Sequence, residues 1–381
     1  MSLKIVLSIA ALASSSSIAA FGASDRPVGV HWAGYPIGNY TSDQGVTLGL
    51  LGRRFDYGDS GVKPFKSVTT FQASHATHGS TVIQLEFEET GVTEHDLRFT
   101  SALTAQRNEN QRYYGLGDQT LRNTTLERQN FYYYEQELLT FENAVRKKIE
   151  SLGWDIQLGI APTLNRSRSL TTAQSGPTLF QNEYGSSRKT SYYTTTHLRF
   201  IRDRRDSEFV PSRGSIASAA LSHSPRFLGQ LPAWSRIDLD YRRYDSFIDG
   251  RKLWLATQAR MTSSSNDAPL VEKARLGSLG TLRGLPLNRY LSNDSLSLRS
   301  ELRSIWYHDS FFDLPLKLGT GVFIDTGKIA SSVSQLTSSS FHSGYGCSLF
   351  GSYFTDDFVG STNIAFSEGA TALYLILGFS Y

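Results

Sequence analysis

Alternation of apolar and polar residues is the feature that most constrains how this chain can fold. From Val28 onward, apolar side chains recur at every second position over almost every segment. Successive side chains of a β-strand point to opposite faces of a sheet, so each segment predicts a strand with one apolar and one polar face. In the segment 236–242, for example, Ile237, Leu239 and Tyr241 alternate with charged residues. We therefore expect an all-β protein.

Two architectures fit alternating strands of this kind. In a soluble sandwich the apolar faces form the core and the charged faces meet water. In a transmembrane barrel the apolar faces meet lipid and the charged faces line the lumen. The composition favours strands over helices, because aromatic residues reach 12% while hydrophobic residues are only 39%. Alternation and composition leave both architectures open.

The lengths of the connections favour the barrel. We predict sixteen strands, near 28–36, 45–56, 65–75, 80–89, 95–105, 128–147, 152–162, 193–202, 213–223, 234–247, 251–262, 295–308, 316–326, 342–354, 357–366 and 371–381. The long connections then fall at one end, at 106–127, 163–192, 263–294 and 327–341, and short ones at the other, at 148–151, 248–250, 309–315 and 355–356. This asymmetry is typical of transmembrane barrels, and an even number of antiparallel strands leaves no free edge in lipid. The connection 203–212 is longer than the rule predicts.

The N-terminal residues have the pattern of a secretory signal peptide, which we place at residues 1–24. Lys4 precedes an apolar run from Ile5 to Ala13, and small residues follow. The run is too short to cross a membrane as a helix. We therefore expect an exported protein whose residues 25–381 form one barrel domain in the bacterial outer membrane.

The C-terminal strand supports the same expectation. Leu373, Leu375, Leu377, Phe379 and Tyr381 share one phase, and the last of them is aromatic. Many bacterial outer-membrane barrels end in this way, and the pattern is read by the machinery that inserts them. We predict that Leu377, Phe379 and Tyr381 form such an assembly signal. The expected partners are then outer-membrane lipids and the barrel-assembly machinery.

Several short motifs coincide in order and spacing. They are Asp203-Arg204-Arg205-Asp206 with Pro211 and Gly214, Leu282-Arg283-Gly284-Leu285, Ser300-Glu301-Leu302-Arg303, and Val322-Phe323-Ile324-Asp325-Thr326-Gly327. They resemble the turn motif, the Val-Arg-Gly-Phe/Tyr loop motif and the two following strand motifs of the BamA/TamA outer-membrane assembly-factor superfamily, the bacterial surface antigen family. The resemblance covers essentially residues 28 to 381, and the turn motif accounts for the long connection.

The resemblance implies an arrangement inside the barrel. The long loop would fold back into the lumen, where Arg283 pairs with Glu301 and Asp325 on adjacent strands. A guanidinium suits two carboxylates because its planar fork offers five donors. Phe323 would pack against the arginine, and Gly284 would let the backbone turn tightly beside it. These five residues are the predicted lumen loop anchor.

Two departures limit the resemblance. Leu285 stands where the family has an aromatic residue, so stacking by that side chain is lost. Only a few residues separate the signal peptide from the first strand, so the resemblance is to a barrel domain without the periplasmic POTRA domains. Whether a separate periplasmic partner replaces them, and whether the barrel forms a homo-oligomer, the sequence leaves open.

The resemblance implies help with the insertion or translocation of proteins, or of lipids, at the outer membrane. Such a role would need a weak seam between the first and last strands. Gly29, Gly34, Gly38 and Gly378 would weaken pairing there, although they would equally relieve crowding where the barrel closes. The alternative is a passive pore or a structural barrel, which could be oligomeric.

Other classes of function have little support. The net charge is only +3 and no block of basic residues occurs, so no nucleic-acid partner is expected. The eight His show no His-Glu-x-x-His spacing, and no Gly-x-Ser-x-Gly elbow occurs. The single cysteine excludes an internal disulfide. We therefore expect no enzyme, no cofactor and no metal.

Overall fold

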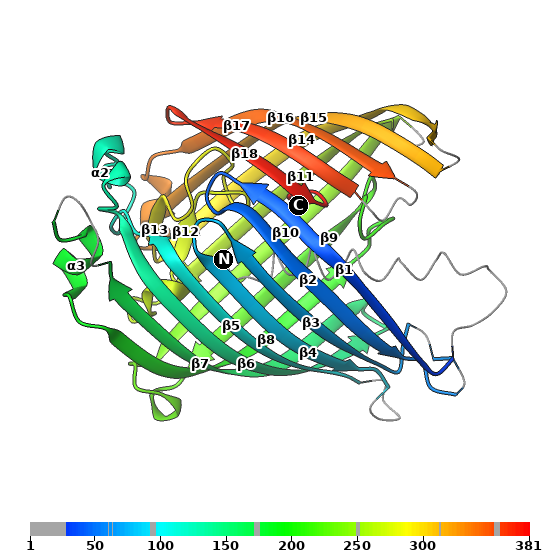
Figure 1. Ribbon diagram of the computed structural model, residues 1–381, viewed down its shortest axis with the longest axis horizontal. Helices are drawn as coiled ribbons and strands as arrows, with labels where there is room; N and C mark the ends of the chain where they lie inside the picture. Colours follow the sequence, from blue (N-terminus) through cyan, green and yellow to red (C-terminus); the bar gives the residue numbers. More distant parts are fainter. Residues whose placement is uncertain are drawn as a thin grey trace.

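Sixteen antiparallel strands of the described residues close into one barrel in a computed structural model of the chain (Figure 1). The structure describes residues 28–59, 61–62, 64–91, 97–170, 176–248, 252–311, 314–353 and 359–381. The predicted signal peptide, residues 1–24, lies outside the described residues. Both the fold class and the number of barrel strands predicted from the alternation are confirmed.

Neighbours in the barrel follow chain order, and the last strand closes on the first. The barrel strands are β1 (Val30–Thr41), β2 (Gly45–Asp56), β3 (Ser67–Ala76), β4 (Ser80–Glu89), β5 (Arg98–Arg112), β6 (Tyr133–Ile149), β7 (Trp154–Ser169), β8 (Lys189–Asp203), β9 (Gly214–Ser224), β10 (Trp234–Ile248), β11 (Leu253–Ser264), β14 (Asp294–Phe311), β15 (Leu314–Ala330), β16 (His342–Tyr353), β17 (Val359–Ser367) and β18 (Ala370–Leu377). The connections contain α2 (Thr124–Arg128), α3 (Leu179–Tyr184), the 3-10 turns η1 (Arg226–Leu228), η2 (Leu270–Glu272) and η3 (Val333–Thr337), and a small sheet of β12 (Ala274–Leu276) and β13 (Tyr290–Ser292).

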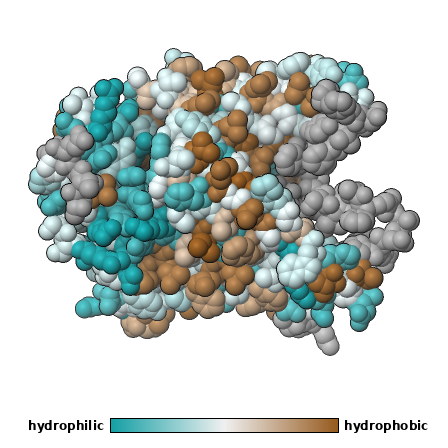
Figure 2. All heavy atoms as spheres, in the orientation of Figure 1, coloured by the Kyte–Doolittle hydropathy of each residue, from teal (hydrophilic) through white to brown (hydrophobic). Residues whose placement is uncertain are grey.

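The period-two pattern sorts side chains into an apolar outer wall and a polar lumen. On β10, Ile237 and Leu239 are exposed on the outer wall. The alternate residues Asp238 and Asp240 point inward, where Asp240 accepts hydrogen bonds from Arg260 of β11. Figure 2 shows an apolar band across the face in view, with more hydrophilic regions toward the ends. An apolar band of this extent around a polar lumen is the surface of a transmembrane barrel.

The helices of the described residues are short and lie in the connections between strands. In the part of the chain that the structure describes, no helix has both the length and the apolar content needed to cross a membrane.

The four longest connections lie together at one end of the barrel, as the sequence predicts. The connections 113–132, 170–188, 265–293 and 331–341 gather at one end, which we call the long-loop end. Turns such as 150–153 lie at the other, which we call the short-turn end. The connections 57–66 and 204–213 are longer exceptions at the short-turn end, and the long-loop end also carries the tight turns 42–44, 77–79 and 368–369.

Several strands end elsewhere than predicted, and β5 and β7, for example, continue to residues 112 and 169 rather than 105 and 162. Three others differ for a clear local reason. Strand β1 continues to Thr41, because it stays paired with β2 up to a tight turn at residues 42–44. Strand β6 begins at Tyr133 rather than 128, because α2 and a turn occupy the preceding residues. Strand β18 ends at Leu377 rather than 381, because Gly378 adopts a positive φ of 86° and turns the chain.

Candidate functional site: the lumen loop and the β1–β18 seam

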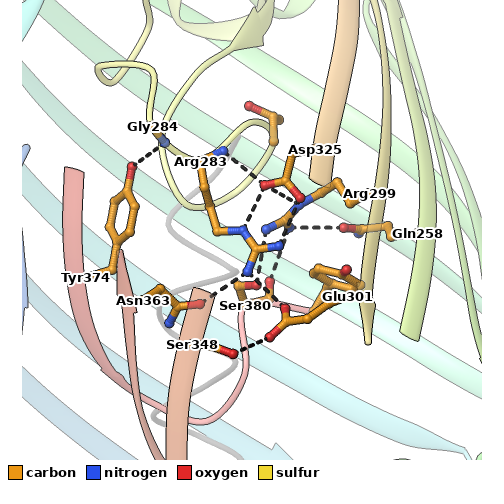
Figure 3. A network of polar contacts seen from close by, with 12 residues as sticks. Gln258, Arg283, Gly284, Arg299, Glu301, Asp325, Ser348, Asn363, Tyr374 and Ser380 are labelled. Carbon is orange, nitrogen blue, oxygen red and sulfur yellow. Dashed lines mark hydrogen bonds and ion pairs between the residues drawn. The ribbon is translucent and has the colours of Figure 1, made fainter. Parts of the chain in front are cut away.

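The connection between β11 and β14 folds back into the barrel and carries Arg283 into the lumen (Figure 3). Its root is the β12–β13 sheet. Leu282 and Leu285 are buried among apolar residues of β12, β13 and β15. The leucine at position 285, where the resembling family has an aromatic residue, is therefore a packing residue that fixes the loop against the wall.

Arg283 is fully buried and hydrogen-bonded to two carboxylates. Its Nε donates to Asp325 Oδ2 at 2.7 Å, its Nη2 to Asp325 Oδ1 at 2.9 Å and its Nη1 to Glu301 Oε2 at 2.9 Å. Nη1 also donates to Asn363 Oδ1 at 3.1 Å, and the backbone N–H of Arg283 to Asp325 Oδ2 at 3.1 Å. We call Arg283, Glu301 and Asp325 the arginine anchor.

The charged state of Arg283 is stabilised by its partners. Burial alone would lower the pKa of Arg283, but the attraction of Asp325 and Glu301 outweighs burial and raises it. The guanidinium therefore stays protonated in the lumen. Removing one partner of a buried ion pair strongly destabilises the folded state, because the other charge is left without compensation.

Phe323 and Gly284 complete the predicted anchor. The guanidinium carbon of Arg283 lies 3.4 Å from the centre of the Phe323 ring, so the ring stacks on the cation. Gly284 has a φ of 95°, and its N–H donates to the Tyr374 hydroxyl of β18 at 3.3 Å. A Cβ at this position would lie 2.9 Å from the carbonyl carbon of Phe366. The close approach to the wall and the positive φ both require glycine.

Adjacent strands bring the two carboxylates together. Arg299 pairs in register with Asp325, and Glu301 with Phe323, across β14 and β15. Arg299 and Arg303 extend the network, because Arg299 Nε lies 3.4 Å from Asp325 Oδ2 and Arg303 Nη2 lies 3.3 Å from Glu301 Oε2. Three guanidinium groups thus share two carboxylates in the lumen.

The last residues turn into the lumen instead of continuing β18. Leu373 and Leu375 are exposed on the outer wall, whereas Phe379 and Tyr381 are buried. The phase that these residues were predicted to share is therefore wrong beyond Leu377, where the chain turns. An assembly signal formed by Leu377, Phe379 and Tyr381 stays a prediction.

The buried C-terminal residues pack on the arginines of β14. Arg303 lies over the Phe379 ring at 4.0 Å and Arg299 over the Tyr381 ring at 4.3 Å. Arg299 Nη2 also donates to Ser380 Oγ at 3.1 Å (Figure 3). The C-terminal residues and the arginine anchor therefore form one network.

The turn motif lies at the short-turn end, away from the anchor. Asp206 Oδ1 accepts from the backbone N–H groups of Ser212 and Arg213, at 2.9 and 3.1 Å. Asp203 Oδ1 accepts from the backbone N–H of Arg205 at 3.1 Å. The two aspartates hold the turn in shape by ordinary turn chemistry.

The other members of the motif shape the same turn. The backbone N–H of Arg204 donates to Ser215 O at 2.8 Å. Gly214 has a φ of 95°, and a Cβ there would overlap the Arg204 carbonyl oxygen. Pro211 is buried, and its neighbour Val210 packs in a cluster with Phe379. The turn therefore reaches back to the C-terminal residues.

The seam between β1 and β18 differs from every other strand contact of the described barrel. Within the described residues, β1 pairs with β18 only at Tyr40–Leu375 and Thr41–Tyr374. The next residue, Ser42, donates its N–H to Leu373 O at 2.9 Å. Neighbouring strands elsewhere share eight or more residue pairs. The edge of β1 from residue 30 to 39 is thus left without β18 as a partner.

The lumen loop crosses this seam at the long-loop end. Asp43, in the turn after β1, accepts from Ser278 Oγ at 2.5 Å and from the N–H of Leu287 at 2.8 Å. Its carboxylate also forms an ion pair with Arg112 of β5. We call these contacts the Asp43 bridge. The loop is therefore bound to the first hairpin by Asp43 and to β18 by the Gly284–Tyr374 hydrogen bond.

Comparison with known proteins identifies the fold. The sequence matches no protein-family model and no curated protein. The structure is similar to BamA from Haemophilus ducreyi lacking POTRA domains 1–3, with a TM-score of 0.66 and 12% identity over 92% of this chain and 70% of that one. The chain has the fold of the BamA barrel.

CdiB barrels have the same fold. CdiB from Escherichia coli matches with a TM-score of 0.54 and 11% identity over 93% of this chain and 64% of that one. CdiB from Acinetobacter baumannii matches with a TM-score of 0.51 and 10% identity over 92% of this chain and 60% of that one. The chain thus spans less than two thirds of the length of the CdiB structures. Identities this low show the fold alone.

Within this BamA-like barrel, the structure adds residues that the motifs did not indicate. Arg299 and Arg303 share the inward phase of Glu301, so alternation places them in the lumen without saying what they touch. Tyr374 lies in the opposite phase to the exposed leucines of β18, which is also a lumen position. Asp43 had no such signal, because aspartate in a tight turn is common for local reasons.

Proposed function

We propose that this chain is an outer-membrane barrel of the BamA/TamA superfamily that helps a protein chain, or a lipid, to insert into or cross the membrane. Its route would be an opening between β1 and β18. The observation that carries the proposal is the edge of β1 from residue 30 to 39, which lacks pairing with β18 within the described residues. A sheet edge that faces no neighbouring strand is a template for an added strand.

The outer membrane is the proposed location. Support comes from the apolar outer wall, from the barrel fold shared with BamA, and from the loop asymmetry. Lipids of that membrane and the machinery that inserts barrels are the proposed partners. The proposal assigns the chain a role in transport and no catalytic step.

A disulfide across the seam tests the proposal. Cysteines at Tyr40 and Leu375 would lie directly opposite each other, at a separation that a disulfide can bridge. The native Cys347 is replaced by alanine, and a photo-crosslinking residue is placed at Pro36 on the β1 edge. In native membranes we expect adducts with other chains at Pro36. Locking the seam should abolish them, and reduction should restore them.

A matched disulfide controls for the cross-link itself. Val145 and Leu158 form an exposed, directly opposed pair on β6 and β7, far from the seam in the strand order. A disulfide there should leave the adducts unchanged. Adducts that persist with the seam locked, or their absence from the unlocked protein, would contradict the proposed opening. Mass spectrometry of the adducts would also distinguish a periplasmic partner from a second copy of the chain.

A passive pore is the alternative, because a sixteen-stranded barrel is wide enough for an aqueous channel. The folded-in loop favours transport through the seam over a constantly open lumen, since Arg283 and its partners are buried there. We expect low conductance from the intact protein in planar bilayers and a higher conductance after deletion of residues 279–291. A large conductance from the intact protein would favour the pore.

A further inference from the structure

Four arginines face outward near the long-loop end of the barrel wall. Arg107 lies on β5, Arg166 and Arg168 on β7, and Arg188 directly precedes β8. Between 44% and 52% of each side chain is exposed. They follow the same phase as exposed apolar residues lower on their strands, such as Ile160 on β7. We call these four residues the outer arginine cluster.

Glutamates of β6 lie between the arginines. Arg107 Nε donates to Glu135 Oε1 at 3.0 Å, and Arg168 binds the other oxygen of Glu135. Arg188 Nη2 donates to Glu137 Oε2 at 2.7 Å. The Glu135 side chain is only 6% exposed, so the arginines form the outer surface of the group.

The cluster has guanidinium N–H donors that face outward and remain available to a ligand. Arg166 Nη1 lies 3.8 Å from Glu137 Oε2, which is beyond hydrogen-bond distance. The four guanidinium groups exceed the three neighbouring carboxylates of Glu109, Glu135 and Glu137 by one positive charge. Each guanidinium has five N–H donors, and about half of each side chain remains exposed. An anion can therefore approach the cluster without displacing the glutamates.

The position of the cluster identifies the kind of anion. One step down the wall, Leu139 pairs with Leu164, and Leu164 with Tyr192 of β8. Residues two apart on a strand are separated by about 7 Å, so the arginines lie immediately beyond the apolar residues. In Figure 2 a hydrophilic region borders the apolar band at the end where α2 and α3 lie. In a transmembrane barrel, the borders of the apolar band are where lipid headgroups lie.

We propose that the outer arginine cluster binds the phosphate group of a lipid in the leaflet at the long-loop end. Guanidinium groups bind phosphate oxygens in pairs, and basic side chains at a membrane surface attract anionic headgroups. The acyl chains of the same lipid would lie against Leu139 and Leu164. On β15 and β16, by contrast, Thr326 and Ser343 pair near the same end and offer only hydroxyl groups. It depends on the barrel lying in a membrane and not on opening of the seam.

Binding in mixed micelles tests the site. The purified barrel is titrated in neutral detergent with phosphatidic acid, which carries a phosphomonoester, with diacylglycerol of the same acyl chains, and with inorganic phosphate. The double variant Arg166→Gln, Arg188→Gln should bind phosphatidic acid on the order of tenfold more weakly or worse. Arg243→Gln is the matched control, because Arg243 is an outward arginine paired with Asp245 nearer the short-turn end.

A gain of binding separates the site from a folding defect. Glu137→Gln removes the carboxylate that competes for Arg188, so this variant should bind phosphatidic acid more tightly than wild type. Equal binding by wild type and the double variant would overturn the proposal, as would an equal loss in Arg243→Gln. Equal affinity for diacylglycerol would show that the phosphate is not recognised. Inorganic phosphate bound as tightly as phosphatidic acid would show that the ligand is not a lipid.

Discussion

The wall of β14 and β15 and the seam of β1 and β18 hold the same loop in opposite ways. The wall pairs along nearly its whole length and places Glu301 and Asp325 around the buried Arg283. The seam has two residue pairs, near one end, and the loop contacts it through a few hydrogen bonds and the packing of Leu279 on a cluster that includes Tyr374. The loop is therefore firmly attached to the wall of β14 and β15, whereas only a few contacts attach it to the seam.

This difference separates two kinds of stability. Loss of contacts at the wall should destabilise the whole barrel, because it leaves buried charges with fewer partners to compensate them. Loss of contacts at the seam should chiefly raise the population of locally opened states, since few pairs oppose opening there. Substitutions on one side at a time distinguish the two.

Arg283→Ala should have the largest effect. It leaves Asp325 buried without its main partner, removes one of the two guanidinium partners of Glu301, and opens a space beside Phe323. The expected loss is about 3–5 kcal/mol of unfolding free energy, measured by urea denaturation in micelles. The loop should also become sensitive to protease. Arg243→Ala, which removes an exposed arginine, should change stability little. Wild-type stability and protease resistance in Arg283→Ala would show that the arginine anchor does not hold the loop.

Gly284→Ala should have the next largest effect on stability. A methyl group at this position would lie 2.9 Å from Phe366 C and from Ser367 Cβ, and the φ of 95° disfavours alanine. The loop would have to move away from β17 and lose the hydrogen bond to Tyr374, at a cost of about 1–3 kcal/mol. Gly369→Ala provides a control, because that glycine also has a positive φ but has no atom within 4 Å of a Cβ. Equal losses in the two variants would assign the effect to φ alone.

The wall is the side that could be predicted from the sequence. Strand alternation has a period of two, so the sequence alone places Glu301, Asp325 and Phe323 on the lumen face of their strands. The resemblance then supplies the arginine that meets them. Alternation could not predict which lumen charges meet, because that depends on strand register and on the path of the loop. The sequence alone therefore does not predict the partners of Arg299 and Arg303.

The seam was less accessible to the same reasoning. The glycines near the strand ends suggested weak pairing but could not say how many residues pair. The Asp43 bridge joins residues 235 and 244 positions apart in the chain, and no local pattern carries that information. The inward turn of the C-terminus depends on a single positive φ at Gly378, which a run of alternating apolar residues conceals.

Asp43→Asn should act on the seam while leaving the wall intact. The change removes the ion pair with Arg112 and weakens the bonds from Ser278 and Leu287. We expect a loss of about 1–2 kcal/mol, expressed as faster hydrogen exchange in β1 and β18 with little change on β14 and β15. Asp245→Asn, in an exposed pair, should leave exchange unchanged. Uniformly faster exchange across the barrel would mean that Asp43 supports the whole fold and not the seam.

Glu368→Gln should have the smallest effect on stability. Its pH dependence tests the contact between the loop root and the hairpin that carries β18. Glu368 lies in the turn between β17 and β18, where the Tyr290 hydroxyl donates to Oε2 at 2.9 Å and His342 Nδ1 lies within hydrogen-bond distance of Oε1. Burial would raise the pKa of Glu368, but these contacts and the nearby Arg289 outweigh burial and lower it. A carboxyl whose pKa is lower in the folded state stabilises the protein above its unfolded pKa, near 4.3. That contribution is lost as the pH falls through the folded pKa.

The stability difference between wild type and Glu368→Gln should therefore be constant above about pH 5 and shrink as the pH falls further. The glutamate is partly exposed, so the difference should stay below about 1 kcal/mol. Urea denaturation of both proteins across this pH range measures it. Because Tyr290 belongs to the loop root and Glu368 to the hairpin that carries β18, the same acidification should speed exchange in β18 before it affects β14. A difference independent of pH would mean that the charge of Glu368 does not hold the loop root to this hairpin.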